Sequence, residues 1–379
     1  MLIDPRTAIL AALVAPLLPI SALLWMRSPE RAAMRFFIAW LGCWGLLTTP
    51  MIIGFANVYD AYPSLTFAPF ETSLWLGPLI WLFTLALTSA RLPARWWCWL
   101  LPGALQTLYY LVCWLGIDSV AAKFAYAREI YNPYIAPAES GIAALLGALC
   151  VTLSWRQSTR YRYWLSRHHS AMRDFDLSSL RLFVVTMTVL IVLWLCVEAW
   201  QIAFGRLNYS EVAYVLMVVG TAVLLLAMDM LASVQRAYPK MDVVAESEPT
   251  AQRAAGLPDV NTIRATIRTE GWYRRPDLTI AQLAREFATN ESSMSAVINA
   301  VPDNNFNALI NGIRLEVICQ KLLDSNEPRT VIALAFAYGF GSKATFNRTF
   351  KERVGMTPSQ FKRANDTSQI PDFSVTSGI

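Results

Sequence analysis

Seven long apolar segments before residue 235 constrain the fold of this chain more than any other feature. They lie at about 7–26, 34–56, 71–90, 94–117, 140–156, 181–204 and 211–234. Each is close to the roughly 20 residues that a helix needs to cross the hydrocarbon core of a bilayer. Backbone polar groups in that core must pair within the segment, so each segment is expected to be an α-helix. Residues 1–234 are therefore predicted to form a seven-helix transmembrane bundle.

The composition agrees with this prediction and excludes an ordinary soluble protein. Of the 379 residues, 55% are hydrophobic and 16% charged, and the mean hydropathy is +0.38. The net charge of +5 comes entirely from the first 240 residues, which carry 17 Lys and Arg against 12 Asp and Glu. The remaining residues carry 15 of each sign. The positive charge thus belongs to the predicted membrane part.

The basic residues predict the orientation of the bundle. One set of alternate connections contains Arg27, Arg31, Arg35, Arg91, Arg95, Arg156, Arg160, Arg162, Arg167, Arg173, Arg181, Arg236 and Lys240. The other set contains only Arg6, Lys123, Arg128 and Arg206. Connections rich in Lys and Arg face the cytoplasm. We therefore expect the N-terminus outside and the C-terminus in the cytoplasm.

A few ionisable or polar residues lie inside the predicted spans. Glu198 lies past the middle of the sixth span, Gln201 follows one turn later on the same face, and Asp229 lies near the inner end of the seventh. Intramembrane carboxylates often mark functional sites, although they can also simply hydrogen-bond a neighbouring helix. These three residues are our candidates for binding a signal.

The chain becomes polar after the last apolar segment. Residues 235–259 contain Pro239, Pro249 and Pro258 among charged and small residues, which predicts a flexible linker. Residues 364–379 are expected to form a flexible tail. The part between them, 260–363, is predicted to be a separate cytosolic domain.

The end of this domain has the pattern of two helices joined by a tight turn. Thr330 is a suitable N-cap for the first helix, and Gly339 suits a left-handed turn. The second helix is predicted to start at Ser342. Its apolar residues Phe346, Phe350 and Val354 recur every four positions, and Lys343, Asn347 and Lys351 recur with the same spacing on another face. This layout is typical of a helix-turn-helix that places its second helix in a DNA groove.

The order of residues here resembles the C-terminal signature of the AraC/XylS transcription regulators. The resemblance rests on Leu334, Ala335, Gly339, Phe340, Phe346, Phe350, Lys351, Gly355, Thr357, Pro358 and Phe361. It implies a DNA-binding domain of two helix-turn-helix units joined by a long helix, here about 305–324. The first unit is expected to begin with a capping box of Thr279 and Gln282, with Asn290 capping its second helix.

The resemblance and the helix faces together suggest which residues meet DNA. Lys343 and Asn347 are expected to reach base edges, and Arg348, Lys351 and Arg353 to grip phosphates. The first unit lacks Lys and Arg between Arg285 and Arg314, so it is expected to position the domain more than to discriminate bases. Its candidate contacts, with the usually basic position of the linking helix, are Ser292, Ser293, Ala296, Asn299 and Arg314.

We therefore expect an all-α, membrane-embedded, one-component transcription regulator of the bacterial inner membrane. Its partners would be promoter DNA, the lipid bilayer, a second copy of the chain and an unknown signal ligand or membrane partner. The alternatives are a transporter or lipid-modifying enzyme with a regulatory DNA-binding domain, and a passively anchored regulator. No catalytic constellation, cofactor motif or metal-ligand spacing is present in the sequence. We expect the fragment from residue 241 to bind DNA by itself.

Overall fold

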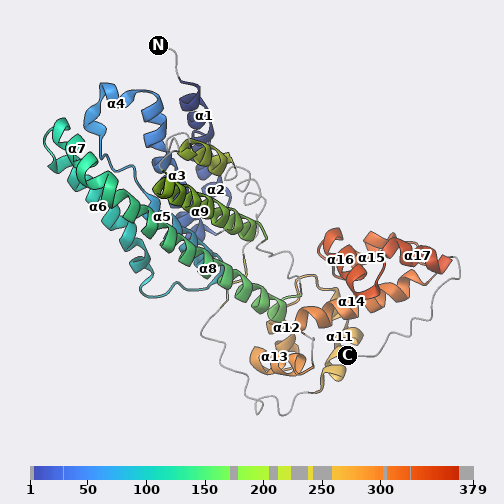
Figure 1. The fold of residues 1–379 in the computed structure, drawn as a ribbon. Coiled ribbons are helices and arrows are strands. Elements are labelled where there is room, and N and C mark those ends of the chain that lie inside the picture. Colours follow the sequence, from blue (N-terminus) through green and yellow to red (C-terminus); the bar gives the residue numbers. More distant parts are fainter. Residues whose placement is uncertain are drawn as a thin grey trace. The chain divides into compact units, whose positions relative to one another are not determined.

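The computed structural model describes residues 4–28, 30–170, 178–204, 212–222, 238–241, 258–301, 305–324 and 326–366. These residues are mostly helical and include isolated bridges but no β-strand, which confirms the all-α class for the described part of the chain. The chain divides into two compact units (Figure 1). Unit 1 comprises Met1–Thr159 and Leu177–Met241, and unit 2 comprises Arg160–Asp176 and Asp242–Ile379.

Unit 1 consists of long apolar helices. These are α1 (Pro5–Val14), α2 (Leu17–Arg27), α3 (Arg31–Phe55), α5 (Ser73–Thr88), α6 (Leu101–Gly116), α8 (Ala136–His168, up to Thr159) and α9 (Ser178–Phe204). Shorter pieces join them: α4 (Val58–Ala61), η1 (Pro63–Leu65), η2 (Trp96–Leu100), α7 (Val120–Tyr126) and η3 (Ala127–Ile135). The middle of the unit is the packing of α3 on α5, where the buried ring of Phe37 contacts the rings of Trp40 and Phe83.

The lengths of these helices bear on the predicted spans. Four helical stretches are long and apolar enough to cross a membrane: Pro5–Arg27, Arg31–Phe55, Trp96–Gly116 and Val120–His168. Three shorter apolar helices are Ser73–Thr88, Leu180–Leu193 and Val212–Ala222. Each predicted span overlaps one of these seven stretches. Because only four have full length among the described residues, the count of seven spans stays a prediction.

One connection differs from the sequence-based expectation. Residues 118–139, which the predicted spans leave as a connection, are largely helical, because α7, η3 and α8 follow one another without a break. The middle piece is a π-helix that contains Pro133, a residue that cannot donate the usual backbone hydrogen bond. The wider π turn is a common way to keep a helix continuous where the α pattern is interrupted.

Close contacts fix α8 to α5 within unit 1. A Cβ atom on Gly77 would lie 3.1 Å from the Cα of Gly147, so the two helix backbones approach closely at this point. Nearer the end of α5, the Gln157 side chain donates hydrogen bonds to Thr88 Oγ1 at 3.0 Å and Ser89 Oγ at 3.2 Å. The part of α8 up to Thr159 is therefore held against α5 at two levels.

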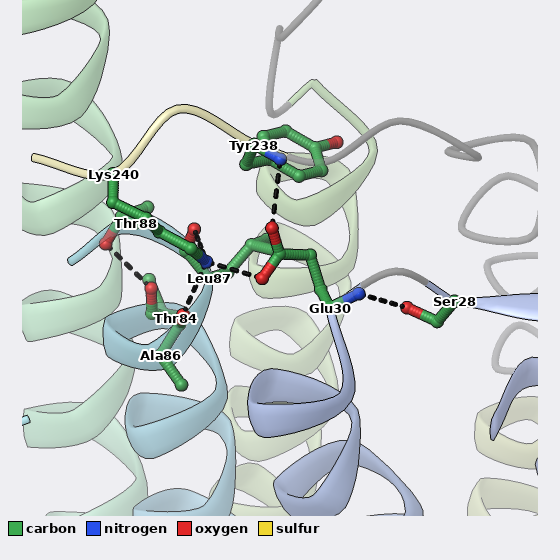
Figure 2. Close-up of polar contacts among 8 residues, drawn as sticks. All are labelled: Ser28, Glu30, Thr84, Ala86, Leu87, Thr88, Tyr238 and Lys240. Carbon is green, nitrogen blue, oxygen red and sulfur yellow. Dashed lines mark hydrogen bonds and ion pairs between the residues drawn. The ribbon is translucent and has the colours of Figure 1, made fainter. Parts of the chain in front are cut away.

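The described residues that follow the last apolar segment are also fixed to unit 1 (Figure 2). Lys240 Nζ donates to Glu30 Oε2 at 2.6 Å and to the carbonyls of Ala86 and Leu87, each at 2.9 Å. The other carboxylate oxygen of Glu30 accepts the backbone N–H of Tyr238 at 3.0 Å. The ammonium group thus pairs with the carboxylate before α3 and with carbonyls at the C-terminal end of α5, where a cation is favourable.

Unit 2 holds the helices of the C-terminal part. They are α11 (Val260–Glu270), η6 (Trp272–Arg274), α12 (Ile280–Glu286), α13 (Glu291–Asn299), α14 (Phe306–Leu322), α15 (Val331–Ala337), α16 (Lys343–Val354) and α17 (Pro358–Asp366). Figure 1 shows α14 lying between the pair α12 and α13 and the group α15 to α17. Residues 242–257 of the predicted linker and 367–379 of the predicted tail lie outside the described residues.

The predicted caps set the limits of these helices. Thr279 and Gln282 form the predicted capping box, with both hydrogen bonds present. The side chains of Asn290, Thr330 and Ser342 accept backbone N–H groups at the starts of α13, α15 and α16. All four predicted helix starts in this unit are therefore confirmed.

A single apolar core joins the helices of unit 2. Its central members are fully buried and come from every helix between α11 and α16: Ile263, Ile267, Leu283, Met294, Ile298, Phe306, Ile310, Ile313, Ile318, Leu334, Phe346 and Phe350. Gly339, between α15 and α16, has the predicted left-handed backbone with φ +93°. A Cβ atom there would lie 2.5 Å from the carbonyl oxygen of Tyr273, so glycine is required both by conformation and by space.

Candidate nucleic-acid interface

Helix α16 has one buried face and one polar face. Phe346 and Phe350 are fully buried, and their rings lie 5.6 Å apart between centroids. On the other side, Lys343 and Lys351 are exposed and Asn347 is partly exposed. This confirms the predicted division of the helix into an apolar and a basic polar face. Two ammonium groups and an amide at i, i+4 and i+8 form a row that suits contact with a groove.

The two arginines on α16 have other contacts that restrict them. Arg348 Nε donates to Glu352 Oε1 at 2.8 Å in an i, i+4 pair that partly neutralises it. Arg353 Nη2 donates to the carbonyl of Ala308 at 2.9 Å, which ties the end of α16 to α14. Partial burial of its guanidinium lowers the pKa of Arg353. Arg353 therefore links α16 to α14 although it is exposed, as Arg348 is, and the predicted phosphate contacts of both arginines stay predictions.

The candidates on α13 are less favourably placed. Ser292 and Ala296 are partly exposed, whereas Ser293 is only 3% exposed because it lies beside the core residue Met294. Asn299 turns back to its own helix, where its amide donates to the carbonyl and hydroxyl of Ser295 at 2.7 and 2.8 Å. Ser292, Ala296 and Asn299 are thus the partly exposed candidates on this helix, with the amide of Asn299 already bonded within the helix.

Arg314, one of the expected DNA contacts, is buried. It is 1% exposed, and its guanidinium donates to the carbonyls of Tyr273 at 2.8 Å and Arg275 at 2.6 Å and to Asn311 Oδ1 at 3.1 Å. Burial lowers its pKa to about 10, while Asp277 acts in the opposite direction. The family resemblance alone placed Arg314 among the residues expected to meet DNA. Arg314 instead lies inside unit 2, where it joins α14 to the turn before α12.

The side chains of the three candidate signal-binding residues lie outside the part of the chain that the structure describes. Glu198 and Gln201 lie in α9, but their side chains are outside the described part of the chain, and so is Asp229. These three assignments remain predictions.

Unit 1 contains a partly buried polar network around Glu139 that the sequence did not single out. Glu139 accepts hydrogen bonds from Gln106 at 2.5 Å, Tyr110 at 2.9 Å and Tyr131 at 3.3 Å. Gln106 also donates to Ser73 at 2.9 Å. The predicted spans place Glu139 in a connection, because it precedes the fifth apolar segment by one residue. The signal that could have revealed it is the i, i+4 recurrence of Gln106 and Tyr110 within an otherwise apolar helix.

The comparisons with known proteins bear on unit 2. Residues 283–364 match the family model described as a helix-turn-helix domain. The matched range runs from within α12 to within α17 and includes the polar face of α16. It supports a DNA-binding regulator of the AraC type, a class that is typically not enzymatic. The comparisons with curated proteins and with solved structures found no match.

Proposed function

We propose that this chain is a membrane-embedded, one-component transcription regulator of the AraC type. In this proposal, α12 with α13 and α15 with α16 act as two helix-turn-helix units held by α14. Helix α16 enters the major groove of promoter DNA, and unit 1 spans the inner membrane with the C-terminus in the cytoplasm. The observation that carries the proposal is the exposed polar row of Lys343, Asn347 and Lys351 inside the matched region.

The chemistry of this row fits base recognition better than unspecific attraction alone. Lys343 is the first residue of α16, and Asn347 lies one turn later. A lysine suits the acceptor atoms of guanine, and an asparagine suits adenine. Lys351 and Arg348 lie further along, where phosphate contacts are expected. Ser292 and Ala296 of α13 would add contacts without charge, so the first unit mainly sets the position of the domain.

The membrane part is proposed to sense a signal and to act on DNA binding. Glu198, Gln201 and Asp229 remain candidates for binding it. A signal would act through different affinities for two arrangements of the helices, with a typical coupling of about 1–3 kcal/mol. Paired promoter sites would favour a homodimer.

Chromatin-crosslinking sequencing of the full-length protein tests the proposal. Wild-type protein should occupy a small number of promoters, and Lys343→Ala with Lys351→Ala should abolish most of this occupancy. Lys321→Ala is the control, because Lys321 is a partly exposed lysine at the end of α14 that pairs with Asp324 at 3.7 Å. Equal occupancy for the double variant and wild type would contradict the role of α16.

A further inference from the structure

Residues that follow the long helix α8 belong to unit 2 and not to unit 1. Ser170, two residues beyond the end of α8, is 3% exposed. Its backbone N–H and its hydroxyl both donate to the carbonyl of Leu278, at 3.1 and 2.8 Å. The carbonyl of Ser170 accepts a hydrogen bond of 2.6 Å from the amide of Asn307. One residue is thus bonded both to the segment before α12 and to the first turn of α14.

These contacts adjoin the buried Arg314. Arg314 Nη2 lies 3.5 Å from Ser170 Oγ and 2.6 Å from the carbonyl of Arg275. Burying a guanidinium requires that its donors be matched by acceptors, because an unmatched buried charge is costly. The residue after α8 therefore completes the polar surroundings of the side chain that fixes α14 to the turn before α12.

A pocket beside this contact gives the end of α8 room to move. It has a volume of about 270 Å³ and is lined by Ser166 of α8, Asn311 of α14, and Arg348 and Glu352 of α16. Ser166 therefore faces the helix proposed to read DNA across a polar space. Because this side is not closely packed, a small shift of α8 can be accommodated without breaking the apolar core of the unit.

Helix α8 is one continuous element that contributes to both units. Up to Thr159 it belongs to unit 1, where Gly147 and Gln157 are fixed against α5, and from Arg160 it belongs to unit 2. An α-helix transmits displacement along its axis because each backbone bond constrains the next turn. The backbone N–H of His169 still bonds to Leu165 at 2.9 Å, so the helical constraint extends to the residue before Ser170.

We propose that the end of α8, docked through Ser170 onto Leu278 and Asn307, is the element that couples unit 1 to the DNA-binding helices. This inference rests on the proposed function. Coupling is reciprocal, so binding of DNA to unit 2 must also change the state of the α8 end. A fragment that starts at residue 241 lacks this element and leaves Asn307 and the Leu278 carbonyl without these partners.

Hydrogen–deuterium exchange on the full-length protein in lipid nanodiscs tests the coupling. The probe is the promoter DNA recovered from the crosslinking experiment. In the wild type, DNA should slow exchange in α16 and also, by about fivefold or more, in residues 160–170. Asn307→Ala should raise exchange in residues 160–170 without DNA and reduce the DNA effect there to below about twofold, while protection of α16 persists.

Two further variants make the outcome decisive. Ser170→Ala removes only the hydroxyl bonds and should weaken the DNA effect on residues 160–170. It serves as the test variant if Asn307→Ala fails to fold. Gln320→Ala, on the exposed side of the same helix α14, should behave as wild type. Protection of α16 by DNA with no change in residues 160–170 of the wild type would overturn the coupling. Absence of protection at α16 would instead refute the proposed function itself.

Discussion

Replacing Gly339 by alanine should destabilise unit 2 strongly, for two separate reasons. The left-handed backbone at φ +93° costs an L-residue about 1–2 kcal/mol. The new Cβ would also lie 2.5 Å from the carbonyl of Tyr273 and 2.9 Å from Arg314 Nε, and forcing packed atoms apart costs about 1–3 kcal/mol. Together these effects give about 2–5 kcal/mol, a large part of the about 5–15 kcal/mol typical of a domain.

Gly355→Ala separates the two contributions. Gly355 has a similar left-handed backbone, φ +82°, but its Cβ position meets no atom within 4 Å. The control should therefore lose only the conformational part, about 1–2 kcal/mol. Pulse proteolysis of the full-length protein in increasing urea, followed with a C-terminal epitope tag, measures the free energy of unfolding of unit 2. Equal losses for the two variants would refute the close packing of Gly339 over the Arg314 site.

Three further predictions concern single side chains. Lys343→Ala should weaken specific promoter binding by about 1–3 kcal/mol, measured by fluorescence anisotropy at fixed salt, with an unchanged urea midpoint. His169 is held neutral because burial, aided by the nearby His168, lowers its pKa from 6.5 to about 4. His169 binds a proton at a higher pH in the unfolded chain than in the folded chain. The free energy of unfolding therefore has its full value above about pH 6.5 and decreases as the pH falls towards 4. By pH 5 the loss should be about 1 kcal/mol after allowance for partial exposure. It should be seen as lower amide protection factors in residues 160–170, corrected for the slower intrinsic exchange at low pH, and be absent in His169→Gln. Lys240→Met should lower the thermal stability of the full-length protein in detergent by about 1–3 kcal/mol, because Glu30 and two carbonyls lose a charged donor, whereas Lys240→Arg should lose less.

Sequence reasoning succeeded where the determinants of structure are local. The helix starts at Thr279, Asn290, Thr330 and Ser342 are set by a side chain that accepts a backbone N–H three residues later, so the pattern is visible in any short window. The apolar stripe of α16 is likewise a matter of spacing along one helix. Such features do not depend on which distant segment packs against them.

The failures concern contacts between distant parts of the chain. The family resemblance placed Arg314 among the DNA contacts, but acceptors from distant segments, among them the carbonyls of Tyr273 and Arg275, match its guanidinium inside unit 2. Ser170 contacts Leu278 and Asn307, which lie more than a hundred positions away in the sequence, and no local sequence pattern predicts these contacts. Glu139 was missed for a related reason, since its partners lie on another helix and in a segment taken to be a loop.

Ion pairs within unit 2 explain part of the balance between acidic and basic residues in the C-terminal part of the chain. The 15 acidic residues beyond residue 240 balance the 15 basic ones. Many of these charges pair within the unit, as in Arg264 with Glu316, Arg275 with Glu286 and Arg329 with Glu327. Such pairing reduces the positive charge that unit 2 can offer to phosphates, so the salt dependence of binding should be shallower than 15 basic residues alone would suggest. A domain with such modest electrostatic affinity would depend on a second copy or on the arrangement of its helices to occupy a promoter. Any influence that α8 exerts on α14 would then have a large effect on promoter occupancy, because electrostatic attraction to DNA would be too weak to maintain binding by itself.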